Sequence, residues 1–178
     1  MPGEQPPARR HHSLIPERSA VVLKVDTSLG PVSFGANGLG GFIEAAVDGG
    51  RIDVDAAPAA HLELDVIRLT SGNSIYDTEL RRQIDTRRFP RAYVDLHRAS
   101  AIDRDSSTFQ VSGEITLRGV TVPADGVVVA ALPERELMVV SGEETIDLSD
   151  FGIPPPSLFM IKIDPEVKLR LYLAARGE

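Results

Sequence analysis

The chain contains no cysteine and no tryptophan, and it has only four histidines. Disulfides, thiolate metal sites and cysteine nucleophiles are therefore excluded, and an imidazole-rich metal centre is not expected. With 3 Tyr and 6 Phe among 178 residues, little aromatic surface is available for stacking nucleic-acid bases. The formal charge of −7 disfavours nucleic acid or an anionic membrane as the main partner.

Long hydrophobic runs are also missing. No stretch approaches the roughly 18 consecutive apolar residues of a membrane-spanning helix, so no stable membrane insertion is expected. Residues 1–18 are rich in proline and contain no apolar run typical of a signal peptide. We expect a disordered arm there, with the adjacent His11 and His12 solvated, and one domain over residues 19–178. The sequence thus predicts a cytoplasmic protein with no metal and no cofactor.

What the chain does contain is apolar residues at every second position, the pattern of half-buried strands. It predicts a first strand around residues 21–25, a last strand around 167–173, and strands over 62–66 and 109–117. After Val66 the alternation inverts at Ile67, which suggests a bulge or a long strand. Further strands are expected at 41–47, 51–54, 92–97, 127–131, 137–140 and 158–163.

Turn residues separate these segments. Turns are expected at 48–50, 103–106, 124–126 and 141–142. About ten strands with short connections and no alternation with helices favour an all-β antiparallel barrel or sandwich.

One segment has helical spacing instead. Tyr76, Leu80 and Ile84 lie four residues apart, and Ser74 is placed to cap a helix over residues 74–85. Phe89-Pro90 ends it. Such a helix in an all-β chain is expected to cover the mouth or side of a barrel.

Several motifs of the chain are candidates for a chemical role. Asp150-Phe151-Gly152 lacks the other kinase motifs, and the glycine-rich stretch 35–41 lacks the Lys-Ser/Thr of a phosphate loop. The arginines at 81, 82, 87, 88 and 91 are interpreted as a solvated helix face, with an anionic headgroup or partner as the alternative. His61 and His97 lie on polar sides of strands, where surface roles outweigh general-base roles.

Four spaced blocks resemble the YceI-like family. They are Ile84-Asp85 with Phe89-Pro90-Arg91-Ala92, the segment 113–121 containing Leu117-Arg118-Gly119-Val120-Thr121, Ile146 with Asp150-Phe151-Gly152-Ile153, and the strand 166–173. This resemblance implies a lipocalin-like, eight-stranded antiparallel β-barrel that holds a long apolar molecule such as a polyisoprenoid. It implies binding, transport or sequestration of a long-chain lipid, without catalysis.

A barrel of this size can be filled by its own side chains or hold one slender ligand. The residues expected to line the interior are Phe42, Leu62, Leu64, Val66, Phe109, Val111, Ile115, Val127, Val129, Leu169 and Leu171. Alternation cannot distinguish a hollow barrel from a filled one.

Two other functions stay open. A filled barrel could act as a protein-interaction or stress-response module, through the region of residues 81–91. A hydrolase or isomerase would need His61 or His97 buried in the cavity with a shifted pKa. An edge strand could also support a homodimer.

Overall fold

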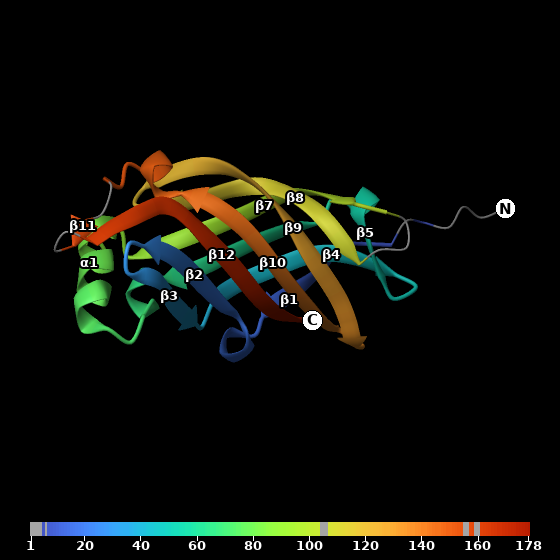
Figure 1. Ribbon diagram of the computed structural model, residues 1–178. Helices are drawn as coiled ribbons and strands as arrows, with labels where there is room; N and C mark the ends of the chain where they lie inside the picture. Colours follow the sequence, from blue (N-terminus) through green and yellow to red (C-terminus); the bar gives the residue numbers. More distant parts are fainter. Residues whose placement is uncertain (1–4, 6, 104–106, 155–156, 159–160) are drawn as a thin grey trace.

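The computed structural model describes residues 5, 7–103, 107–154, 157–158 and 161–178 (Figure 1). The strands are β1 (Arg10–Leu14), β2 (Ala20–Thr27), β3 (Gly30–Asn37), β4 (Gly40–Asp48), β5 (Arg51–Asp53), β6 (Ala59–Asp65), β7 (Arg91–Ala101), β8 (Thr108–Leu117), β9 (Val120–Glu134), β10 (Leu137–Asp147), β11 (Ser157–Leu158) and β12 (Ile161–Gly177). The helices are α1 (Ser74–Ile84) and the short 3₁₀ helices η1 (Pro16–Arg18), η2 (Val54–Ala56), η3 (Val66–Arg68) and η4 (Leu148–Phe151).

Eight strands close into an antiparallel barrel, which confirms the predicted fold class. Around the wall their order is β1, β4, β6, β7, β8, β9, β10 and β12, and β12 pairs with β1 to complete the ring. Closure leaves these strands without exposed edges along the paired stretches, which is how antiparallel sheets avoid association through edges.

The long strand β12 changes partner along its length. Its first part pairs with β2 and its last residues pair with β1. Ser19 lies between β1 and β2 at this change, fully buried, and its hydroxyl donates to the carbonyl oxygen of Ala174 at 3.3 Å and accepts from the Ala174 amide at 3.2 Å. β2 and β3 therefore continue beside β12 toward the α1 end of the barrel.

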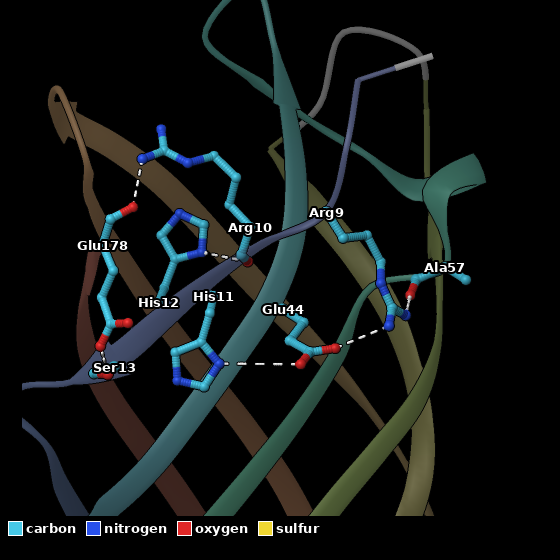
Figure 2. A network of polar contacts seen from close by, with 8 residues as sticks. All are labelled: Arg9, Arg10, His11, His12, Ser13, Glu44, Ala57 and Glu178. Carbon is cyan, nitrogen blue, oxygen red and sulfur yellow. Dashed lines mark hydrogen bonds and ion pairs between the residues drawn. The ribbon is translucent and has the colours of Figure 1, made fainter. Parts of the chain in front are cut away.

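The N-terminal segment corrects the expectation of a disordered arm for residues 10–18. β1 pairs with both β4 and β12, and η1 follows it. Arg9 donates to Glu44 at 2.9 Å, and the Ser13 hydroxyl donates to Glu178 at 3.1 Å (Figure 2). The composition of this segment did not predict a strand. β1 has no alternating apolar pattern, and it is held by hydrogen bonds to the backbone groups of two neighbouring strands.

His11 and His12 lie on different sides of β1. His12 is only 3% exposed, and its Nδ1 lies 3.1 Å from the carbonyl oxygen of Arg10 (Figure 2). His11 is exposed, and its ring lies 4.9 Å from that of Phe42. The expectation that both are solvated is wrong for His12, because alternation along a strand points successive side chains to opposite faces.

Two predicted turns are also corrected. Residues 124–126 lie inside β9, and residues 141–142 lie inside β10. In β10, the missing side chain of Gly142 leaves room for Val128, which would lie 2.8 Å from a Cβ there. The predicted turn at 48–50 is confirmed. Of the predicted turn at 103–106, residues 104–106 lie outside the described residues.

β3 was not predicted. Gly30, Pro31 and Gly35 are poor strand formers, yet the segment pairs with β2 along its length. A backbone bridge between Gly35 and Thr70, at 2.9 and 3.0 Å, then ties β3 to the segment that precedes α1. The apolar alternation inverts after Val66 because the chain forms the 3₁₀ helix η3 there, not a bulge or a longer strand.

α1 lies at one end of the barrel together with β11 (left in Figure 1), and β5 lies toward the other end. Its cap is Asn73, whose side chain accepts hydrogen bonds from the amides of Ile75 and Tyr76, not the predicted Ser74. The helix itself, Ser74–Ile84, matches the predicted span.

The family-like segment around Gly119 holds this end together. Gly119 has φ +71° in the β8–β9 turn, and a Cβ there would lie 2.6 Å from the ring of Phe89. Next to it, the Arg118 guanidinium donates to the carbonyl oxygen of Gly152 at 2.6 Å. This glycine allows a tight turn between the two strands, over which the residues after α1 can pack.

Candidate binding cavity

The larger of the two apolar cavities inside the barrel lies at its α1 end. Its volume is about 130 Å³, far more than the roughly 10–15 Å³ that one water molecule requires. Its wall is formed by inward residues of β2, β3, β6, β12 and the inner face of α1. Representative lining residues are Val21, Val25, Phe34, Leu64, Leu80 and Leu169.

A second cavity of about 80 Å³ lies toward the other end of the barrel. Phe109, Val111 and Met138 are among its lining residues. Leu62 and Leu171 border both cavities. These two residues, which we call the waist, therefore lie between the two cavities.

The lining is overwhelmingly aliphatic, and the polar groups that border the larger cavity lie mainly at the α1 end. They include Thr27 from β2 and Glu79 and Gln83 from α1. Hydrogen bonds from Arg82 and then Gln83 lower the pKa of Glu79, although burial acts in the opposite direction. A long apolar molecule would thus contact aliphatic walls along the barrel and meet most of the hydrogen-bonding groups near α1, while Arg98 borders the second cavity.

α1 is held in place by a buried carboxylate. Burial raises the pKa of Asp77, but hydrogen bonds from Ser71 and Thr70, with the nearby charge of Arg81, outweigh it and leave the pKa lowered. The Ser71 amide donates to Asp77 at 2.7 Å, and the Thr70 hydroxyl donates to it at 2.7 Å. This anchor orients the helix so that Tyr76 and its neighbours on the same face border the cavity.

Most of the predicted lining residues border a cavity. These are Leu62, Leu64, Val66, Phe109, Val111, Ile115, Leu169 and Leu171. The alternation in β6, β8 and β12 was regular enough for the inward face to be identified from sequence.

Three predicted lining residues lie elsewhere. Val127 and Val129 are 46% and 44% exposed on the outer wall, because Val128 is the residue that pairs with the inward Phe109. Phe42 packs on the outside between the rings of His11 and His61, at 4.9 and 5.8 Å. Each error is a shift of one residue in a run of apolar or glycine residues, where the sequence does not show which face is buried.

Several lining residues were not predicted. They include Val32 and Phe34 of β3, and Leu69, Ile146 and Val167. The alternation of Val32 and Phe34 was available as a signal, but the glycines and proline around them obscured it.

His61 and His97 border neither cavity, contrary to the arrangement that the hydrolase hypothesis requires. His61 lies between two carboxylates, with Nδ1 2.6 Å from Asp95 and Nε2 3.0 Å from Glu63. His97 is largely exposed, 4.0 Å from Glu114. The predicted surface location is correct for both, but acid partners that the sequence did not suggest lie beside them across the strands.

Among the described residues, no three His, Asp or Glu side chains are grouped in a way that could hold a metal ion. Nor does any helix there combine the length and apolar character needed to cross a bilayer.

Solved structures with the same fold share little sequence with this chain. BcnA of Burkholderia cenocepacia superposes with a TM-score of 0.74 at 16% identity, over 90% of this chain and 98% of that protein. A polyisoprenoid binding domain from Saccharophagus degradans gives 0.72 at 14%, over 94% and 98%. The YCEI protein of Campylobacter jejuni gives 0.56 at 14%, over 76% and 81%.

A comparison with curated protein sequences gives no match. The profile of the YceI-like domain, in contrast, matches residues 14–175, which is nearly the whole barrel. The closed eight-stranded wall, the helix at its end and this match agree, and the chain belongs to the YceI-like domain family.

Proposed function

We propose that this protein binds a polyisoprenoid or a similar long-chain lipid inside the barrel, as a non-enzymatic carrier or sequestering protein. The observation that carries the proposal is the pair of aliphatic cavities inside the barrel, which share Leu62 and Leu171 as lining residues. Apolar cavities of this kind stay dry and accept apolar ligands. The name of the structural relative from Saccharophagus degradans, a polyisoprenoid binding domain, supports the chemical class.

The energetics are sufficient for a slender lipid. Each buried methylene contributes ~0.8 kcal/mol, so about ten carbons contribute roughly 8 kcal/mol before the costs of association are subtracted. The groups at the α1 end, Thr27 and Gln83 among them, can hydrogen-bond a terminal polar group. Binding therefore needs no catalytic residue.

Two valines, one facing a cavity and the other facing outward from the barrel wall, test the proposal. Val111 borders the second cavity and is 8% exposed, whereas Val127 is 46% exposed on the outer wall. We expect Val111→Glu to abolish uptake of a fluorescent polyprenyl alcohol, because an unpaired carboxylate in an apolar cavity is strongly unfavourable. Val127→Glu should bind like the wild type.

Native mass spectrometry of the purified protein, followed by lipid extraction, provides a second measurement. A bound polyprenyl species at stoichiometric level would support the proposal and give its chain length. A wild-type protein that carries no lipid and takes up no polyprenyl alcohol would overturn it in favour of a filled barrel with an interaction role. Circular dichroism of Val111→Glu separates loss of binding from loss of the fold, and if this variant unfolds, Leu171→Phe provides the alternative test.

A further inference from the structure

Three large apolar side chains are exposed around the α1 end of the barrel. Leu29 in the β2–β3 turn is 74% exposed, Ile67 in η3 is 60% exposed and Ile75 in the first turn of α1 is 56% exposed. Residues one or two positions away from each of them border the larger cavity: Thr27, Val66 and Tyr76. Isolated exposed apolar residues are common, but these three share the end of the molecule at which the cavity is covered by a helix.

Basic side chains accompany them. Arg87 and Arg88 lie three and four residues after the end of α1 and are exposed. Arg88 lies 5.4 Å from the ring centre of Phe89, and Arg87 has no ion-pair partner among the residues that the structure describes. We name Leu29, Ile67, Ile75, Arg87 and Arg88 the α1 rim.

The carboxylates of this region do not neutralise it. Residues 65–91 contain six arginines and four carboxylates, in a chain whose formal charge is −7. Asp65 lies 3.4 Å from Arg91 and Glu79 lies 2.6 Å from Arg82, so two carboxylates are already paired within the segment. A third, Asp77, is buried. Within residues 65–91 the charge that is left is positive, whereas Asp26 of β2, Asp150 of η4 and Asp164 of β12 are exposed carboxylates on the other elements at this end.

We infer that the α1 rim docks on the surface of an anionic lipid bilayer, with the larger cavity next to the membrane from which the lipid is taken or to which it is delivered. Exposed aliphatic side chains insert at the boundary between headgroups and acyl chains, and arginines bind anionic headgroups beside them. The net negative charge of the rest of the chain, including the carboxylates of β2, η4 and β12 at this end, is repelled by such a surface and so favours contact through the segment 65–91. This inference rests on the proposed lipid-binding function.

The test is flotation of the full chain with vesicles of phosphatidylcholine, with and without phosphatidylglycerol. Two double variants remove the rim: Ile67→Ser with Ile75→Ser, and Arg87→Gln with Arg88→Gln. The matched controls are Ile102→Ser, also 56% exposed but in the β7–β8 connection, and Arg135→Gln in the β9–β10 turn. Both control sites lie at the opposite end of the strands from α1.

The wild type should bind the vesicles that contain phosphatidylglycerol and should be released by salt. The arginine variant should bind about thirtyfold more weakly, since each basic side chain near an anionic leaflet contributes roughly fivefold. The isoleucine variant should lose at least roughly tenfold by removing apolar contacts. Both controls should bind as the wild type does.

Uptake of a polyprenyl alcohol delivered from cyclodextrin, without vesicles, separates this inference from the proposed function. If that uptake is normal while the wild type does not float with anionic vesicles, the docking surface is refuted and the lipid-binding function stands. If vesicles bind through the α1 rim but the protein takes up no prenol, the docking surface stands and the lipid-binding function is refuted. Equal loss of flotation in control and rim variants would also refute the docking surface.

Discussion

At the scale of single residues, the outer wall carries a histidine whose charge is stabilised by the fold. The hydrogen bond to Asp95 is the largest influence that raises the pKa of His61, and Glu63 adds to it, while burial partly opposes both. Only the imidazolium can donate to both carboxylates at once. His61 and Tyr93 also stack, with ring centres 5.9 Å apart.

This arrangement predicts a pH-dependent contribution to stability. A pKa that is raised in the folded state adds stability below the ordinary histidine pKa of 6.5, and this stability is lost as pH rises through the folded pKa. Asp95→Asn should therefore lower the free energy of unfolding by about 0.5–1 kcal/mol more near pH 5 than near pH 9. Urea titrations at both pH values measure it, with Glu114→Gln beside the exposed His97 as control. An equal loss at both pH values would contradict the role of His61.

At the scale of elements, α1 shows how the spacing of apolar residues can predict a helix while its capping residue is predicted wrongly. The apolar spacing of Tyr76, Leu80 and Ile84 predicts the helix, but both Asn73 and Ser74 are residue types that cap helices. The choice depends on the backbone: Asn73 has extended φ and ψ of −116° and 113°, while Ser74 is already helical. Thr70, tied to β3, sets where the chain turns into the helix.

The cap gives a matched pair of substitutions. Asn73→Ala should destabilise the protein by about 1 kcal/mol, because the amides of Ile75 and Tyr76 lose their acceptor. Ser74→Ala, in the exposed first turn, should change the stability by less than about 0.5 kcal/mol. Urea denaturation followed by circular dichroism compares the two, and a larger effect at Ser74 would show that the cap is wrongly placed.

At the scale of the whole molecule, the proposed function predicts that the two cavities and the waist between them limit the length of the ligand. We expect a short prenol such as farnesol to occupy the larger cavity alone, and a longer one such as solanesol to extend past Leu62 and Leu171. The proposal thus places the selection of chain length far from the groups at the α1 end that would hold the polar head.

Narrowing the waist tests this selection. Leu171→Phe places a larger side chain between the two cavities. An overpacked interior costs about 1–3 kcal/mol, which weakens the binding of a lipid that must pass this side chain. We expect binding of solanesol to weaken at least about tenfold and binding of farnesol to weaken much less, because Leu171 borders only one end of the larger cavity. Tyr172→Phe, 47% exposed on the outer face of the same strand, is the control. Equal loss for both prenols would contradict a waist.

Much of the barrel can be derived from the sequence, because a strand places every second side chain on one face and a buried face must be apolar. Leu62, Leu64, Phe109, Val111 and the alternating residues of β12 were recognised in this way. The blocks around Leu117-Arg118-Gly119 identified the family, and the helix followed from its spacing.

Only the tertiary structure determines which strands pair with each other and in which register. In the run Val127–Val129 every residue is apolar, so the partner strand alone determines that Val128 faces inward. β1 and β3 form because neighbouring strands offer backbone groups to them, although their own residues are polar or poor strand formers. His61 meets Asp95 and Glu63 only in the folded wall. Side-chain patterns record which residues are buried, but hydrogen bonds between distant strands set the register, and the register decides which side chains line the cavity.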